Sequence, residues 1–92
     1  MIFSFRHKGL EQLFLRGDGR KLPPELLGRI RTMLLALDSA VAVEELSLAT
    51  YRLHSLRGDL KGYWSVTVRA NWRIVFRFES GNVYDADFMD YH

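Results

Sequence analysis

Apolar residues in the first half of the chain recur at helical spacing. Over residues 8–15 they fall on one side of a helix, and Gly17 follows at a position where helices commonly end. A second stretch opens with Pro23 and Pro24, and proline is tolerated in a first helical turn. Its apolar residues repeat at steps of three and four as far as Val41. The pattern predicts a short helix followed by a longer one that ends near residue 40, each with one buried side.

The second half of the chain alternates apolar and polar residues, which is the period of a β-strand. Short turns containing glycine or asparagine separate the alternating stretches, and such connections favour antiparallel hairpins. A short alternating stretch also opens the chain. The expected strands are residues 2–5, 51–56, 63–68, 72–78 and 83–89. This order predicts an α+β domain, in which an N-terminal strand and two helices pack on one face of a mainly antiparallel sheet.

Alternation along each strand predicts which side chains share a face of the sheet. Large apolar side chains define the inward face: Leu53, Trp64, Val66, Val68, Trp72, Ile74, Phe76, Phe78, Tyr84, Ala86 and Phe88. Charged and polar side chains gather on the opposite face: His54, Arg73, Arg77, Asp85, Asp87 and Tyr91. Such a face is either an ordinary solvated surface or a site for a charged substrate.

The length and composition of the chain limit its class. Its 92 residues suffice for one domain with a modest core, and the chain contains no cysteine, so disulfides and cysteine-based metal sites are excluded. No apolar run approaches the roughly 20 residues of a membrane span. The first residues alternate before reaching Arg6, unlike a signal peptide, in which charge precedes an apolar run. We therefore expect a cytoplasmic protein that does not associate with membranes.

Charge is distributed unevenly, although the net charge is only +2. Between residues 52 and 77 the only acid is Asp59, whereas four acids follow near the C-terminus. The basic residues of that stretch are Arg52, Arg57, Lys61, Arg69, Arg73 and Arg77. Ten of the thirteen basic residues in the chain are arginine, whose planar guanidinium can bind a phosphate through two parallel hydrogen bonds. A basic stretch beside an acidic end indicates a polyanion site with carboxylates nearby.

The polar face carries the groups that RNA cleavage by a neighbouring 2′-hydroxyl requires. One group must accept the hydroxyl proton, another must protonate the leaving oxygen, and fixed cations must stabilise the phosphate. His54 is a candidate, although a single histidine is more often an ordinary surface residue. The chain ends on Asp90, Tyr91 and His92, which is an unusual concentration of such groups for a terminus. The sequence contains neither a glycine-rich nucleotide-binding loop nor a helical metal-binding motif.

Several blocks of the sequence resemble the HigB family of RelE-like toxins from type II toxin–antitoxin pairs. The blocks are RLHSLRGD at 52–59, GYWSV at 62–66, VRANWRI at 68–74 and DYH at 90–92. They occur in the family's order with similar spacing, and the start of the chain is also similar. The resemblance covers essentially the whole chain and implies the RelE-like fold.

The resemblance also implies an activity, namely ribosome-dependent cleavage of translated messenger RNA without cofactor or metal. It implies His54, Asp90, Tyr91 and His92 as the catalytic group and Arg73 as a phosphate contact. Arg57 stands where relatives often have lysine, and the remaining expected RNA contacts are Lys61, Arg69 and Arg77. The implied partners are the ribosome with its message and a HigA-type helix-turn-helix antitoxin, through which the toxin reaches operator DNA indirectly.

Two other functions fit the same sequence. A domain of this fold can bind RNA or the ribosome through a basic face without cutting, and it can also serve as a regulatory partner of a helix-turn-helix protein. Neither function requires the ending Asp90-Tyr91-His92. That ending favours the enzyme.

Overall fold

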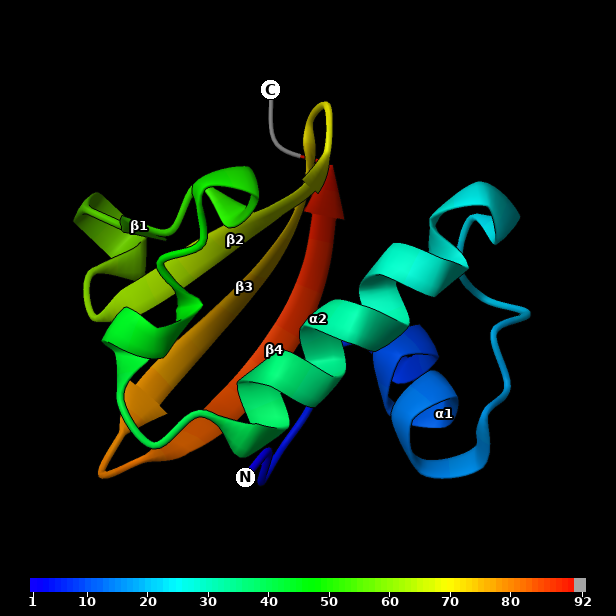
Figure 1. The fold of residues 1–92 in the computed structure, drawn as a ribbon, viewed down its shortest axis with the longest axis horizontal. Helices are drawn as coiled ribbons and strands as arrows, with labels where there is room; N and C mark the ends of the chain where they lie inside the picture. The colour runs from blue at the N-terminus through cyan, green and yellow to red at the C-terminus, as the bar shows by residue number, and fades with distance from the viewer. Residues whose placement is uncertain (91–92) are drawn as a thin grey trace.

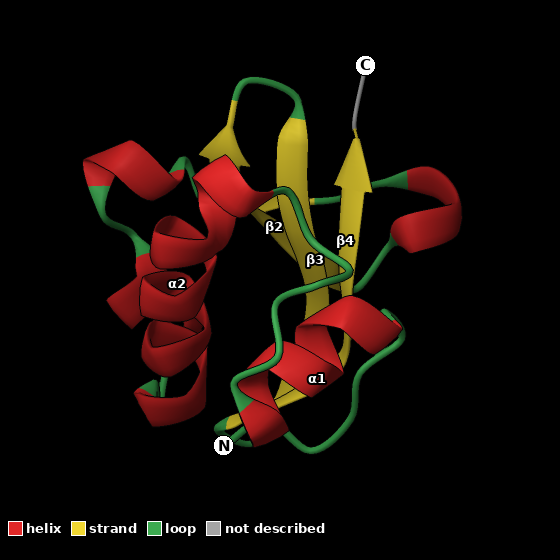
Figure 2. Cartoon of the chain, turned by 90° about the vertical axis from the view of Figure 1, so that its right-hand side faces the viewer, coloured by secondary structure: helices red, strands yellow, loops and turns green. Residues whose placement is uncertain are grey.

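The computed structural model describes residues 1–90 of the chain, which fold into two layers. One layer is a four-stranded antiparallel sheet in the order β1-β2-β3-β4, and the other is a pair of helices (Figure 1). Figure 2 shows both helices lying over the same face of the sheet. The elements are α1 (Lys8–Arg16), α2 (Leu27–Ser39), β1 (His54–Ser55), β2 (Tyr63–Arg69), β3 (Trp72–Glu79) and β4 (Asn82–Asp90). The predicted α+β architecture, with helices on one sheet face, is confirmed.

Both predicted helices are present, and local signals explain their ends. His7 caps the start of α1, where its Nδ1 accepts the backbone N–H groups of Gly9 and Leu10 at 3.0 and 3.3 Å. Gly17 ends α1 in the left-handed conformation with φ 70°. A 3₁₀ turn, Pro24–Leu26, leads into α2.

The expected burial of Val41 is wrong. Helix α2 ends at Ser39 and the backbone becomes extended at Ala40, so Val41 lies beyond the helix and is 76% exposed. The buried side of α2 consists of Ile30, Met33, Leu34 and Leu37.

The strand expected over residues 51–56 is much shorter than predicted. Only His54 and Ser55 pair with β2, because Ala49–Tyr51 forms a 3₁₀ turn that buries Tyr51. Arg52 follows in the left-handed conformation, with φ 49° and ψ 53°. A left-handed residue interrupts an extended run, so the strand begins two residues later. The other three strands of the meander are confirmed near their predicted bounds.

The strand expected over residues 2–5 pairs with the edge of β4 without forming a continuous ladder. Parallel bridges join Ile2 to Val83 and Phe5 to Ala86. Between these bridges lies Asp85, whose backbone adopts φ 56°. The left-handed residue interrupts the ladder.

A β-bulge at the same place reverses the side-chain alternation of β4. Val75 pairs with Asp87, but Arg77 pairs with Tyr84, so β4 has one residue more than β3 between these pairs. Val83 is therefore buried in the core, and Tyr84 shares a face with Arg77, whose guanidinium carbon lies 5.0 Å from the ring centroid. The predicted inward position of Tyr84 is wrong for this reason.

The core lies between the sheet and the two helices. Phe76 is the largest of its fully buried side chains, and Trp72 stacks on Phe88 at one end with ring centroids 4.7 Å apart. Among the described residues, no helix has both the length and the apolar character that a bilayer crossing requires. The helices thus cover one sheet face, and the face that carries His54 remains available for chemistry.

Candidate active site

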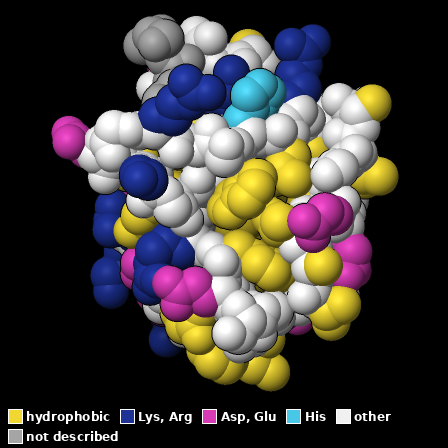
Figure 3. Space-filling view, turned by 90° about the vertical axis from the view of Figure 1, so that its left-hand side faces the viewer, with side chains coloured by type: hydrophobic (Ala, Val, Ile, Leu, Met, Phe, Trp, Pro, Cys, Tyr) yellow, Lys and Arg dark blue, Asp and Glu magenta, His cyan; other side chains and the backbone are white. Residues whose placement is uncertain are grey.

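A shallow hollow lies on the sheet face opposite the helices, where β1, β2 and β3 meet. Its volume is about 180 Å³. Five of the described residues line it: His54, Ser55, Leu56, Ser65 and Arg73. Seen from the β1 side of the molecule, basic side chains and histidine gather on one part of this face, next to hydrophobic side chains (Figure 3). The hollow therefore brings together two residues that the sequence singled out, His54 and Arg73.

Strand pairing and a contact with a nearby backbone carbonyl hold His54 at the rim of the hollow. It pairs with Ser65 across β1 and β2, and its Nδ1 contacts the carbonyl oxygen of Arg52. A carbonyl oxygen can only accept, so Nδ1 carries the hydrogen of this bond. In the neutral ring Nε2 is then the nitrogen with the free lone pair. The exposed imidazole can accept a proton from a substrate through Nε2.

Arg73 lies in the next row of the same sheet face, opposite Thr67 on β2 and Met89 on β4. Its Nη1 donates to the carbonyl of Ala70 at 2.8 Å, which anchors the guanidinium to the β2–β3 turn. No carboxylate among residues 1–90 forms an ion pair with it. Its positive charge is available to an anionic ligand.

The last two described residues, Met89 and Asp90, lie on β4 next to the Arg73 end of β3. Met89 is the direct partner of Arg73, and Asp90 follows opposite Trp72 at the end of the sheet, where it is exposed. The pairing places Asp90 on the Trp72 side, whereas Arg73 and Met89 share the other face. The predicted site residues Tyr91 and His92 lie outside the described residues.

The other predicted RNA contacts lie around the hollow and do not line it. Arg57 and Lys61 are exposed in the connection between β1 and β2, and Arg69 is exposed at the end of β2. Exposed cations in these positions can bind phosphates without taking part in proton transfer.

Arg77 is the one predicted contact that the structure places in a different environment. Its Nε donates to Asp85 at 3.2 Å and its Nη1 to Glu79 at 2.7 Å. The hydrogen bond that Arg77 donates to Asp85 raises the pKa of Arg77 above its ordinary value. Asp85 also accepts hydrogen bonds from the hydroxyls of Tyr63 and Ser4, at 3.4 Å each. Arg77 thus belongs to a polar cluster at the bulge of β4.

Residues 1–90 contain no cluster of three or more histidine, aspartate or glutamate side chains suited to a metal ion. The groups present in the hollow are an imidazole, a guanidinium and two hydroxyls. They can exchange protons and stabilise negative charge.

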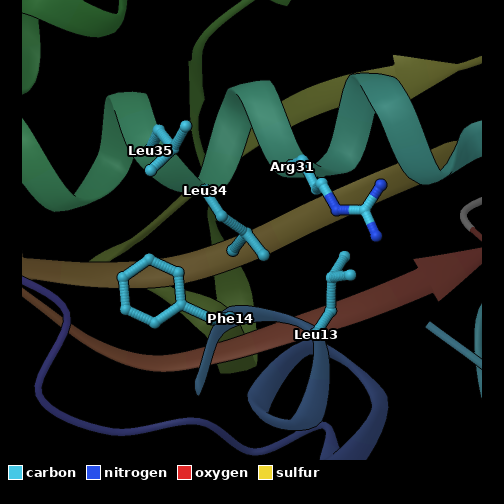
Figure 4. Close-up of a pocket in the computed structure, with 5 residues that line it drawn as sticks. All are labelled: Leu13, Phe14, Arg31, Leu34 and Leu35. Atoms are coloured by element: carbon cyan, nitrogen blue, oxygen red, sulfur yellow. The ribbon is translucent and has the colours of Figure 1, made fainter. Parts of the chain in front are cut away.

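A larger groove of about 290 Å³ lies between α1 and α2, on the helical side of the molecule (Figure 4). Leu13, Phe14, Leu34 and Leu35 form most of it, and Arg31 is its only charged residue. A groove without an acid or a base does not suit proton transfer. The smaller hollow at His54 is the better candidate for catalysis.

Sequence reasoning assigned no role to two residues that the structure makes prominent. Ser65 lies directly opposite His54, which could not be predicted without the register of the two-residue strand β1. His7 caps α1. Its place just before the helical pattern was a signal for a cap.

Solved structures of bacterial proteins share this fold. A mutant of YafQ from E. coli matches with a TM-score of 0.63 at 14% identity, covering 98% of this chain and 93% of that one. The YoeB–YefM complex from Staphylococcus aureus matches with a TM-score of 0.61 at 14% identity, covering 100% and 95%. The fold is that of the RelE-like toxins.

Sequence comparison then gives the family. Residues 3–92 match the HigB-like toxins, described as the RelE-like toxin of the type II toxin–antitoxin system HigB. Endoribonuclease HigB of Proteus vulgaris is 49% identical over 92 residues, the full length of both chains. Toxin HigB-1 of Vibrio cholerae is 32% identical over 84 residues, covering 88% of this chain and 87% of that protein. The chain belongs to the HigB-like toxin family, as the sequence blocks indicated.

Proposed function

We propose that this protein is an endoribonuclease that cuts messenger RNA on the ribosome and thereby inhibits translation and growth. The observation that carries the proposal is that His54 and Arg73 line one hollow on the exposed sheet face. A proton acceptor and a guanidinium that forms no ion pair with a carboxylate of residues 1–90, at one place, are what phosphodiester cleavage needs. The name of the Proteus vulgaris relative, an endoribonuclease, supports the same activity.

The proposed chemistry uses the 2′-hydroxyl of the RNA as nucleophile. Nε2 of His54 takes the hydroxyl proton, the 2′-oxygen attacks the phosphorus, and the bond to the 5′-oxygen breaks. His92 supplies a proton to the departing 5′-oxygen, and the other product carries a 2′,3′-cyclic phosphate. Arg73 offsets the negative charge that builds on the phosphate. Tyr91 stacks on a base or orients the phosphate.

Asp90 is the alternative proton acceptor. Its position opposite Trp72 is three residues along β4 from Asp87, which lies in the His54 row. At about 3.3 Å per residue this is about 10 Å, so Asp90 and His54 do not occupy one position. A proton acceptor must be within hydrogen-bond reach of the hydroxyl, and His54 on the rim of the hollow is the residue we favour.

The open, shallow form of the site supports dependence on the ribosome. The hollow is shallow and His54 is exposed, so the protein alone offers little to orient a flexible RNA. Binding the message in a fixed geometry can supply a large part of the rate enhancement. We propose that the ribosome holds the message and that Arg57, Lys61, Arg69 and Arg77 contribute contacts to RNA phosphates.

The proposed partner is an antitoxin of the HigA type with a helix-turn-helix domain. Membership in a type II toxin–antitoxin family implies an antitoxin, and a structural relative was solved as a toxin–antitoxin complex, YoeB–YefM. Contact with operator DNA would occur only through this partner. The complex would act in the cytoplasm, where translating ribosomes and messages are found.

Primer extension on a defined message tests the proposed function. We expect cuts with translating ribosomes, none in free RNA, and a loss of roughly 10²- to 10⁴-fold in cleavage rate for His54→Ala. Arg20→Ala is the control, because Arg20 is exposed and its one ion pair within residues 1–90 is with the neighbouring Asp18 at 2.8 Å. Ribosome binding without cuts would favour a non-cleaving module of the same fold, and unchanged cleavage by His54→Ala would remove this residue from the chemistry.

A further inference from the structure

Ser65 forms the floor of the hollow. It is only 5% exposed and lies between His54 on β1 and Val75 on β3 in one row of the sheet. Val75 is buried as well, although it is not part of the core between sheet and helices. Thr67 and Arg73 form the next row, two residues or about 7 Å further along β2. Ser65 therefore lies at the base of the hollow that His54 and Arg73 border.

The Ser65 hydroxyl has no hydrogen-bond partner among residues 1–90. Its oxygen is also not sealed inside the protein, because no fully enclosed side-chain oxygen in the described chain lacks a partner. The remaining exposure of this side chain thus opens into the hollow. A hydroxyl with one donor and two acceptor sites is presented to whatever occupies that space.

Two donors converge on the hollow from different strands. The Arg73 guanidinium comes from β3 and the Ser65 hydroxyl from β2, with the His54 imidazole beside them on β1. Fixed donors that point at one place suit an oxygen on which negative charge develops during a reaction. Neither donor pairs with a carboxylate of the described residues, so both are available to an anion.

We propose that the Ser65 hydroxyl donates a hydrogen bond to a non-bridging oxygen of the scissile phosphate, alongside Arg73. This inference rests on the proposed ribonuclease function and adds a catalytic residue to it. The Ser65 hydroxyl comes from the middle of β2, and the pairing of β2 with β3 holds the residue in place. The contact strengthens as charge builds on the phosphate, so it accelerates cleavage more than it strengthens binding.

Single-turnover cleavage of a ribosome-bound message tests the role of Ser65. We expect Ser65→Ala to lower the rate at saturating ribosome concentration at least about tenfold, which corresponds to the loss of one hydrogen bond of about 1.4 kcal/mol. The ribosome concentration for half-maximal rate should stay within about twofold of wild type. Ser47→Ala is the matched control, because it removes the same hydroxyl at an exposed position in the connection between α2 and β1.

A message with sulfur in place of one non-bridging oxygen at the cleaved linkage identifies the contact. Sulfur accepts hydrogen bonds poorly, so for one of the two diastereomers Ser65→Ala should slow cleavage less than it does with the normal phosphate. Equal slowing with both diastereomers and with the normal phosphate would overturn the contact. Ser65→Cys is the companion variant, since its near-identical shape preserves folding and its thiol is a weak donor.

The outcomes separate this inference from the function on which it rests. Wild-type protein that cuts no message would remove the proposed function itself. Wild-type cleavage matched by a folded Ser65→Ala would leave that function intact and overturn the role of Ser65. A circular dichroism spectrum and melting temperature like those of wild type show that the variant is folded.

Discussion

His54 shows how much a single residue's chemistry depends on its backbone. The imidazole alone is an uninformative feature of the sequence, but the Arg52 carbonyl beneath Nδ1 fixes which ring nitrogen is free. That carbonyl is aimed by the left-handed turn at Arg52, which no periodicity in the sequence predicts. His54 and Arg73 could be chosen from the sequence, whereas Ser65 and the orientation of the imidazole required the structure.

His7 makes the stability of the fold depend on pH. Burial is the main cause that lowers the pKa of His7 below 6.5, with Lys21 adding to the effect and Asp87 opposing it. The folded protein therefore binds this proton less readily than the unfolded chain. Stability is fully present above pH 6.5 and decreases as the pH falls below it, until the lower pKa of the folded state is passed. Protonation at Nδ1 would also remove the acceptor that caps α1.

Melting temperatures at pH 7.5 and 5.5 test this role of His7. We expect wild type to lose several degrees at the lower pH, and we expect His7→Asn to lose clearly less. Asparagine can cap a helix but does not titrate, so it preserves the start of α1 while removing the proton uptake. An equal loss in both proteins would assign the pH dependence to other groups.

At the scale of elements, the bulge in β4 is the feature that joins the N-terminal segment to the sheet. Asp85 holds φ 56° there and accepts from the side chains of Ser4, Tyr63 and Arg77, which come from three other segments. Aspartate and asparagine tolerate this backbone region better than most residues. The bulge thus depends on one side chain for both its conformation and its contacts.

Substitution of Asp85 separates these two contributions. We expect Asp85→Ala to lower the free energy of unfolding by about 1–3 kcal/mol, because it removes the shared acceptor of the cluster and places alanine in the left-handed region. Asp85→Asn should cost less, since it keeps an acceptor oxygen and the backbone tolerance. Urea unfolding measures both variants, and equal stability of Asp85→Ala and wild type would contradict the account of the bulge.

Sequence periodicity predicted some of these elements correctly and others wrongly. Helices α1 and α2 and the meander β2-β3-β4 were predictable, because their apolar patterns run for two or more turns or for a whole strand. Tyr84 was misplaced since one extra residue in a strand reverses every later alternation. The segment before His54 was misread as a strand because a 3₁₀ turn and a left-handed residue leave no periodic signal.

At the scale of the whole molecule, the residues that form the core and the residues of the candidate site lie on opposite faces of the sheet. The helices and one sheet face form the core, and the other face bears the hollow. The family and the fold were predictable from the sequence blocks, because the blocks keep the family's order and the resemblance covers essentially the whole chain. The pairing of β1 with β2 was not predictable, because it joins His54 and Ser65 through a strand of two residues.

The central claim is that His54 and Arg73 act together at one hollow, and a double-mutant cycle in ribosome-dependent cleavage tests it most directly. The rates to compare are those of wild type, His54→Ala, Arg73→Ala and the double variant, measured in single turnover on a defined message. We expect each single variant to lose at least about 10²-fold. The double variant should lose far less than the product of the two, because groups that act as a unit are not additive. Losses that multiply, or a single variant with wild-type rate, would show that the two residues do not form one catalytic site.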